Sequence, residues 1–181
     1  MHFSAIDIAL LTWFHNHLIP HSVPVLQFIS DSTTFVSITI AAVILVISVA
    51  RKSVPVRVKF FILVTVLILG SVVTRGIKSL IDRDRPFTTY SYIEKLSSGG
   101  DSSFPSGHTV EAFAVAAAML ALFSRRKIII PLYAWAMLVA YSRMALGVHY
   151  PSDVLAGILI GSLIGWAVPW AAGKFSIAAG S

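Results

Sequence analysis

Long apolar stretches separated by short polar segments dominate this chain. Five of them approach or reach the length of about 20 residues that a helix needs to cross the hydrocarbon core of a membrane. They lie at residues 32–50, 57–80, 106–123, 128–146 and 153–172. The stretches are continuously apolar rather than alternating, and a membrane-spanning segment must satisfy its backbone polar groups internally, so helices are expected rather than barrel strands. The pattern predicts an all-α membrane protein, a bundle of five transmembrane helices.

Residues 3–19 form a further apolar segment that is interrupted by polar positions. Asp7 lies early in it, and residues 15–17 read His-Asn-His. We expect this segment to be an amphipathic helix on the outer membrane surface. A sixth span is the alternative, but it would place an N-terminus without a basic residue before Arg51 on the side of the basic loops.

The composition supports a protein whose solvent is the bilayer. Of the 181 residues, 56% are hydrophobic and 12% are charged, whereas a soluble domain has about 25% charged residues. We expect residues 1–181 to form a single membrane-embedded domain with a polar loop over residues 88–103. The chain has no cysteine, which excludes disulfides and thiolate chemistry.

The net charge of +6 does not indicate nucleic-acid binding, because most basic residues fall in short loops between the predicted spans. Alternation of the spans places these loops on one side, and an excess of Lys and Arg marks the cytoplasmic side. Residues 81–105 and 147–152 are then extracytoplasmic. The basic residues of the cytoplasmic side are Arg51, Lys52, Arg57, Lys59, Arg125, Arg126, Lys127 and Lys174.

Six basic residues lie away from the cytoplasmic loops and require another explanation. If the second span continues as a helix to Arg85, Lys78 and Arg85 lie two turns apart on one face. Two neighbouring cations in a poorly solvated place imply an anion, either Asp82 or Asp84 or a phosphate from outside. The six residues are Arg75, Lys78, Arg83, Arg85, Lys95 and Arg143.

The second polar cluster is the hexapeptide SFPSGH at residues 103–108. It predicts extended chain up to Pro105, followed by a helix that Ser106 caps. The first amides of that helix, at Gly107 and His108, would point outward without intrahelical partners. A helix start of this kind is a suitable binding site for an anion.

The third cluster lies between the fourth and fifth predicted spans. Arg143 ends one helix, Gly147 permits a turn, and Pro151 suits the first position of the next helix. His149 and Asp153 are four residues apart, so the carboxylate can orient one ring nitrogen and leave the other directed at a substrate. This arrangement is typical of an activated nucleophile.

The inferred topology places all three clusters on the same membrane face. Together they supply three cations, a helix start with free amides, a hydroxyl group and two histidines. These groups can hold a phosphoryl group and transfer it.

The three clusters resemble the three-part signature of the type 2 phosphatidic acid phosphatase family, which consists of integral membrane lipid phosphatases. The resemblance covers residues 78–153. The N-terminal segment of this chain is similar to the interfacial helix that follows the first span in six-span members of the family. The signature appears here as Lys78-x6-Arg85-Pro86, Pro105-Ser106-Gly107-His108 and Ser142-Arg143-x5-His149-x3-Asp153.

The resemblance implies a role for each matching residue. His149 would attack phosphorus to form a phosphohistidine, Asp153 would hold its ring, and His108 would protonate the leaving oxygen and later activate water. It implies no metal and no cofactor, and apart from Asp82 and Asp84 no acidic cluster suits magnesium. The implied phosphate-binding residues are Lys78, Arg85, Ser106, Gly107 and Arg143.

The implied partners are a membrane lipid phosphate and the bilayer, with the site on the extracytoplasmic side of a bacterial inner membrane. A polyprenyl (undecaprenyl) diphosphate or a broad range of lipid phosphates is the first expectation for the substrate. Lipid A 1-phosphate and phosphatidylglycerophosphate are the alternatives. Vanadium-dependent haloperoxidases share the signature but are soluble, and a lipid or anion transporter would not need the His–Asp pair. Nothing in the sequence indicates the oligomeric state.

Overall fold

The structure, a computed structural model, describes residues 5–100, 102–123 and 125–178, with side chains up to residue 174. These residues form helices and loops, with no strand among them. In chain order the helices are α1 (Ala5–Asn16), the short 3-10 helix η1 (Pro20–Ser22), α2 (Val23–Ala50), α3 (Val54–Ile81), α4 (Pro86–Thr89), α5 (Gly107–Phe123), α6 (Arg126–Ala145) and α7 (Pro151–Ala178).

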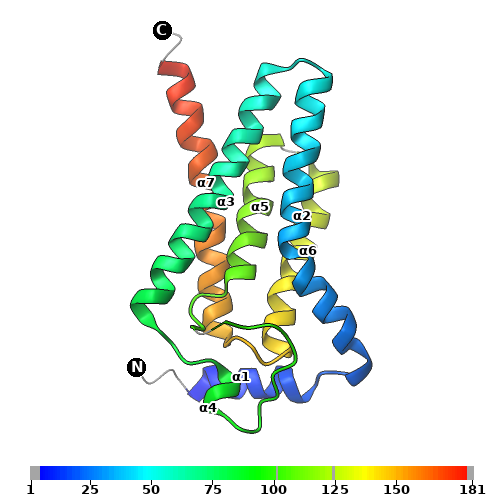
Figure 1. The fold of residues 1–181 in the computed structure, drawn as a ribbon, viewed down its shortest axis with the longest axis vertical. Helices are drawn as coiled ribbons and strands as arrows, with labels where there is room; N and C mark the ends of the chain where they lie inside the picture. The colour runs from blue at the N-terminus through cyan, green and yellow to red at the C-terminus, as the bar shows by residue number, and fades with distance from the viewer. Residues whose placement is uncertain (1–4, 101, 124, 179–181) are drawn as a thin grey trace.

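The five long helices run along the long axis of the molecule, and α1 lies across one end of the bundle (Figure 1). Helices α2, α3, α6 and α7 are long and apolar enough to cross a membrane, whereas α5 is shorter, with 17 residues. Helix α5 contacts all four of the others, and its residues 112–119 are buried. The predicted helical membrane bundle is confirmed. The count of five crossings stays a prediction, because α5 reaches only about 25 Å at 1.5 Å per residue.

Helix α5 packs closely against the glycines of α7. A Cβ atom at Gly161 would collide with the backbone oxygen of Val110 and lie 3.0 Å from the backbone nitrogen of Ala114. One turn to either side, an added Cβ would collide with the backbone oxygen of Ala114 at Gly165 and would lie 2.9 Å from the Cβ of Thr109 at Gly157. The flat small-residue face predicted from the sequence is therefore present. It fixes α7, which carries Asp153, against α5, which carries the helix start of the second cluster.

Several helices are longer than the predicted spans, the last by six residues at its end, Ala178. Helix α2 begins at Val23 rather than at residue 32. Helix α3 ends at Ile81, close to the predicted end at residue 80, and Asp82 adopts a left-handed conformation with φ of 40°. A helix that continues to Arg85, the condition under which Lys78 and Arg85 would share a helix face, is therefore not present. Arg85 is extended with ψ of 156°, as expected for a residue that precedes a proline such as Pro86.

The N-terminal helix α1 lies at the end of the bundle with its apolar side outward. Ile6, Leu10 and Trp13 are exposed, whereas Asp7 and Leu11 are buried. At 12 residues the helix is about 18 Å long, too short to span a membrane. The expected helix is confirmed, but its acidic residue points into the protein. Residues 3 and 4 of the predicted segment lie outside the described residues.

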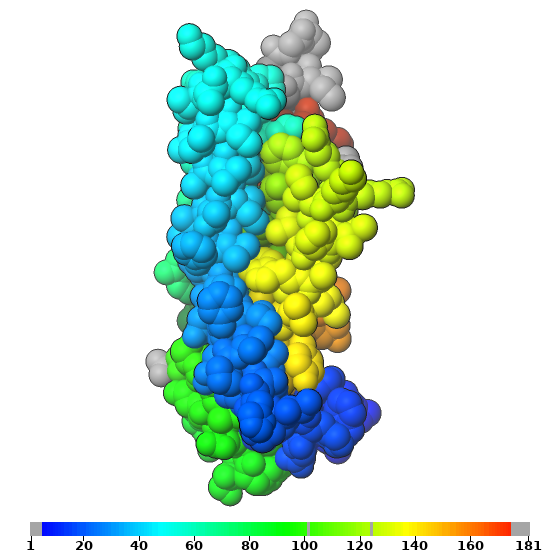
Figure 2. Space-filling view, turned by 90° about the vertical axis from the view of Figure 1, so that its right-hand side faces the viewer, coloured from blue at the N-terminus to red at the C-terminus, as the bar shows by residue number. Residues whose placement is uncertain are grey.

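The three polar clusters and the basic loops occupy opposite ends of the bundle. The turn between α2 and α3, the start of α6 and the end of α7 lie at one end, and α1, α4 and the start of α5 lie at the other (Figure 1). Figure 2 shows α1 in dark blue beside the green segment that follows α3, at the same end. The prediction that the three clusters share one end is thus confirmed.

Candidate active site

The three clusters meet at one cavity of about 850 Å³. Its walls come from α2, α3, α5 and the last turn of α6, and from the loops that precede α5 and α7. Six of the eight site residues predicted from the sequence line it. They are Lys78, Arg85, Gly107, His108, Arg143 and His149.

His149 lies in the turn between α6 and α7. This turn depends on Gly147, whose φ of 72° favours glycine and whose added Cβ would lie 2.5 Å from the backbone oxygen of Glu94. The ring of His149 is only 2% exposed, yet it borders the cavity. The turn therefore holds the ring in a buried position at the cavity wall.

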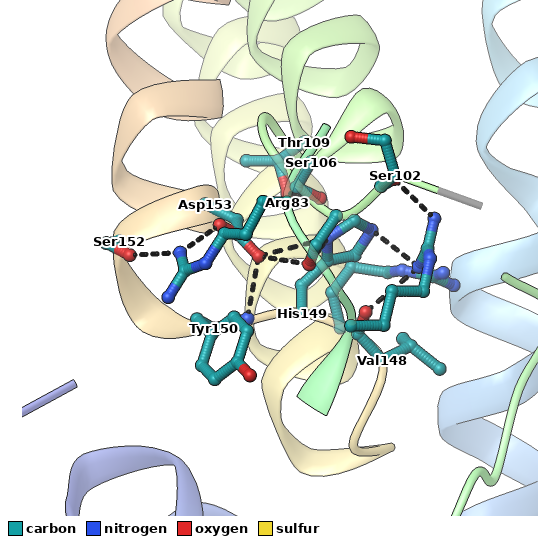
Figure 3. A network of polar contacts seen from close by, with 12 residues as sticks. Arg83, Ser102, Ser106, Thr109, Val148, His149, Tyr150, Ser152 and Asp153 are labelled. Atoms are coloured by element: carbon teal, nitrogen blue, oxygen red, sulfur yellow. Dashed lines mark hydrogen bonds and ion pairs between the residues drawn. The ribbon is translucent and has the colours of Figure 1, made fainter. Parts of the chain in front are cut away.

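The two ring nitrogens of His149 face different groups (Figure 3). Nε2 lies 3.4 Å from Nη1 of Arg85, and Nδ1 lies 3.5 Å from Oδ2 of Asp153. A guanidinium can only donate, so Nε2 presents its lone pair and Nδ1 carries the proton toward the carboxylate. These distances are long, as is common before substrate binds. The predicted pairing of His149 with Asp153 is present in the structure.

The environment keeps the His149 ring neutral. Burial lowers the pKa of His149 to about 3, against the upward effect of the hydrogen bond to Asp153. The positive charges of Arg143 and Arg85 lower it further. An imidazole without a proton on Nε2 is able to act as a nucleophile.

Four basic residues line the cavity: Arg75, Lys78, Arg85 and Arg143. Lys78, Arg85 and Arg143 donate hydrogen bonds to neutral oxygen atoms. Lys78 and Arg85 both donate to the backbone oxygen of Ser102, the latter at 3.2 Å. Arg85 also donates to the backbone oxygen of Val148 at 2.9 Å. The cations thus lie close together although they carry the same charge.

Arg143 is 1% exposed and comes from the last turn of α6. It donates to the backbone oxygen of Ser98 at 2.8 Å and to the hydroxyl of Ser97 at 3.2 Å. The hydroxyl of Ser30, from α2, is a further partner. Arg143 therefore joins two helices to the loop that precedes α5.

The start of α5 lies at the cavity as the sequence predicted, but Ser106 has a different environment. Ser106 is fully buried, and its hydroxyl lies 2.8 Å from that of Thr109. Its backbone amide donates to the backbone oxygen of Asp153 at 3.1 Å. Gly107 and His108 are the residues of this segment that border the cavity. The predicted role of Ser106 in phosphate binding stays a prediction.

Behind His149 lies a second group of charges that the sequence did not place in the site. Arg83 donates to Oδ2 of Asp7 at 2.7 Å and to Oδ1 of Asp153. We call Asp7, Arg83 and Asp153 the rear cluster. The hydroxyl of Ser103 donates to Oδ2 of Asp153 at 2.5 Å, and the amide of Tyr150 donates to the same atom at 2.9 Å.

Signals for two of these residues were present in the sequence. Arg83 is one of the six basic residues away from the cytoplasmic loops, and Asp7 is a carboxylate in an apolar segment. Their pairing was not predictable because 76 positions separate them. Ser103 belongs to the hexapeptide of the second cluster, but no role in the site was predicted for it.

The cavity extends from the cations along the helices toward the middle of the bundle. On α3 its wall runs from Lys78 to Val66, a distance of about 18 Å at 1.5 Å per residue. Glu111 is part of the wall and accepts a hydrogen bond from the hydroxyl of Thr34 at 3.0 Å. The hydroxyl of Thr74 also lies in the wall and has no hydrogen-bond partner among the described residues. The cavity therefore has a cationic end, a polar section and an apolar section.

Among residues 5–100, 102–123 and 125–178, no group of three or more His, Cys, Asp or Glu side chains is placed to hold a metal ion. The expectation that the site uses neither metal nor cofactor stays a prediction.

The fold and the site define a class of protein: a helical membrane protein with a cation-lined cavity beside a buried His–Asp pair. The chain belongs to the PAP2 superfamily, whose family model matches residues 59–176. This confirms the resemblance to type 2 phosphatidic acid phosphatases.

Several named phosphatases are similar to this chain. It is 38% identical over 93 residues to undecaprenyl-diphosphatase BcrC of Bacillus subtilis and 36% identical over 77 residues to lipid A 4'-phosphatase of Bacteroides thetaiotaomicron. These matches cover 51% and 42% of this chain and 47% and 34% of the relatives. The matched part of the chain thus spans about half of these relatives or less.

Solved structures confirm the fold over nearly the whole chain. A crystal structure of Aquifex aeolicus LpxE matches with a TM-score of 0.79 at 24% identity, covering 93% of this chain and 97% of that one. The PAP2-type phosphatidylglycerolphosphate phosphatase of Bacillus subtilis matches with the same TM-score at 23% identity, covering 96% and 89%.

Proposed function

We propose that the protein removes phosphate from a membrane lipid phosphate or diphosphate through a phosphohistidine on His149. One observation carries the proposal: the neutral ring of His149 has Asp153 on one nitrogen and presents the other at a cavity lined by cations. Cations placed around a transferring phosphoryl group stabilise the charge of its transition state.

The reaction takes two steps. In the first, Nε2 of His149 attacks phosphorus, the bond between phosphorus and the lipid oxygen breaks, and His108 gives that oxygen a proton. In the second, His108 takes a proton from water, the water oxygen attacks phosphorus, and the phosphorus–nitrogen bond breaks. The products are the dephosphorylated lipid and inorganic phosphate, and His149 returns to its neutral form.

Three of the four cavity cations serve as the phosphate-binding groups. Lys78, Arg85 and Arg143 exchange the carbonyl oxygens of the loop for phosphoryl oxygens, and the amide of Gly107 adds a neutral donor. The exchange is favourable because charged acceptors form stronger hydrogen bonds with cations than carbonyl groups do. Every step uses side chains of this chain alone, so we expect turnover to persist in the presence of a metal chelator.

The substrate that we favour first is a polyprenyl diphosphate. The apolar section of the cavity suits a hydrocarbon chain that enters sideways between helices, and the similarity to an undecaprenyl-diphosphatase supports the choice. Broad activity on lipid phosphates fits the same features.

A second candidate is a lipid whose phosphate is attached to a hydroxyl-bearing group, such as phosphatidylglycerophosphate or lipid A. Glu111 and Thr74 favour it, because a carboxylate and a hydroxyl beside the cations suit a ligand that donates hydrogen bonds. Glu111→Gln distinguishes the candidates. If the second candidate is correct, this variant has a lower kcat/KM on hydroxyl-bearing substrates, and its kcat/KM on polyprenyl diphosphate is unchanged.

We further propose five membrane-spanning helices, with α1 at the interface and the site on the extracytoplasmic face of a bacterial inner membrane. The cysteine-free sequence permits single-cysteine labelling. A membrane-impermeant maleimide added to intact cells should label Tyr92→Cys at the site end and spare Lys52→Cys at the basic end. The opposite labelling pattern would show that the site end faces the cytoplasm.

The central experiment measures phosphate release by the purified protein from a panel of lipids. The panel contains undecaprenyl diphosphate, phosphatidylglycerophosphate, phosphatidate and lipid A, and His149→Ala is the matched control. We expect release from at least one lipid and a loss of at least about 10⁴-fold in the variant. A wild-type protein that releases no phosphate but translocates lipid, with translocation lost in His149→Ala, would instead identify a transporter.

A further inference from the structure

The N-terminal helix α1 is tied to the catalytic pair by buried charges. Asp7 and Arg83 are each 6% exposed, and Asp153 is fully buried. Arg83 lies between the two carboxylates and donates to both of them. Asp7 also accepts from the amide of Ser152 at 2.8 Å and from its hydroxyl at 2.7 Å.

The order of charges in the rear cluster has an electrostatic consequence for His149. Two carboxylates and one guanidinium leave a net charge of one negative behind the ring. With Asp153 and Arg83 alone, the guanidinium would cancel the carboxylate that faces His149. Asp7 neutralises Arg83 from its far side, and the low dielectric of a buried site makes such charges effective.

The reaction places positive charge on the His149 ring. When Nε2 bonds to phosphorus, Nδ1 keeps its proton and the imidazole becomes cationic. A negative group behind the ring stabilises this charge as it develops. A neutral group in its place would not stabilise this charge.

We infer that Asp7 and Arg83 are positioning residues of the active site, through which α1 sets the charge and the orientation of Asp153 behind His149. The inference rests on the proposed function. It makes α1 part of the catalytic machinery, where the sequence indicated only a helix on the membrane surface. Further contacts fix α1 at its other end, where the ring of His15 lies 3.1 Å from the backbone oxygen of Ala145 and accepts from the amide of Glu94 at 3.2 Å.

Charge-changing variants of nearly constant shape test the inference. Asp7→Asn makes the rear cluster neutral, and we expect kcat to fall about 10- to 100-fold with KM within twofold of wild type. Asp82→Asn is the matched control, because Asp82 is exposed at the same end of the molecule and asparagine tolerates its left-handed backbone. We expect the control to leave both constants within twofold of wild type.

The double variant Asp7→Asn/Arg83→Gln separates charge from packing. It restores a net charge of one negative, so we expect its kcat to exceed that of Asp7→Asn at least threefold. A purely structural role would give further loss, because a second buried hydrogen-bonding residue has been changed. If Asp7→Asn does not fold, the double variant is compared with Asp82→Asn: a kcat within tenfold supports the inference, and a greater loss overturns it.

The outcomes distinguish this inference from the proposed function. A wild-type protein without phosphatase activity on any lipid overturns both. An active wild-type protein with unchanged kcat in Asp7→Asn, or with an effect on KM alone, overturns the inference and leaves the proposed function standing. A double variant no faster than Asp7→Asn also overturns the inference.

Discussion

The two nitrogens of the His149 ring face two regions whose cations have different hydrogen-bond partners. On the cavity side, Lys78, Arg85 and Arg143 donate mostly to backbone carbonyl and hydroxyl oxygens of loops. On the rear side, Arg83 is paired with two carboxylates in a closed and almost fully buried cluster. Behind the ring, Arg83 has two carboxylate partners, whereas in front of it Lys78, Arg85 and Arg143 donate hydrogen bonds to neutral oxygen atoms.

This difference indicates which charges serve the fold and which serve a ligand. A buried cation with carboxylate partners already has its counter-charge, so it contributes to a fixed arrangement. Cations that donate to backbone carbonyl and hydroxyl oxygens can exchange these acceptors for the oxygens of an anion, which form stronger hydrogen bonds. The two groups should therefore respond differently when an arginine is replaced by glutamine.

The largest expected effect on stability is at the rear. Arg83→Gln leaves two buried carboxylates without their cation, and we expect the free energy of unfolding to fall by about 3–5 kcal/mol. Equilibrium unfolding in mixed detergent micelles measures it. Arg75→Gln is the control, since Arg75 is exposed and donates to Ser71, and a change within about 0.5 kcal/mol is expected. Equal destabilisation by both variants would contradict the role assigned to the rear cluster.

On the cavity side the expected effect is on activity. Arg85→Gln removes a cation from the transition state, so we expect kcat/KM to fall about 10²- to 10³-fold while the free energy of unfolding changes by only about 1 kcal/mol. Inorganic phosphate should raise the melting temperature of the wild type more than that of this variant. If Arg85→Gln were as destabilising as Arg83→Gln and kept its activity, the comparison would fail.

A smaller effect is expected from pH. Burial lowers the pKa of His149 to about 3 from 6.5, so the unfolded chain binds this proton in a range where the folded protein does not. The stability linked to His149 is therefore complete above about pH 6.5 and is lost as the pH falls toward 3. We expect the melting temperature of the wild type to fall more between pH 6.5 and pH 4 than that of His149→Asn. Parallel curves, or a ring that NMR shows to be protonated at pH 5, would contradict the assignment.

The sequence predicted the cavity side of the site far better than the rear side. The cavity residues occur in short local patterns, such as the helix start at Gly107 and the spacing of His149 and Asp153, and local spacing is preserved when a chain folds. The pairing of Asp7 with Arg83 depends on how α1 lies across the end of the bundle, which a pattern along one helix does not contain.

The same reasoning applies to the helices. The glycines of α7 repeat at one helical face, so their contact with α5 followed from periodicity. The end of α3 depends on a single left-handed residue, Asp82, and hydrophobic periodicity does not mark such a position. The structure therefore brings Arg85 to the cavity through a turn rather than along the helix face.

The central claim is that Nε2 of His149 becomes covalently bonded to the phosphoryl group. The most direct test is rapid quenching of the purified protein during turnover of a lipid labelled with ³²P in the phosphate that is released, followed by digestion at high pH, where phosphohistidine survives. We expect acid-labile label on the peptide that contains His149, and none in His149→Ala. Full turnover by the wild type with no labelled peptide, or label on the peptide that contains His108 instead, would contradict the account.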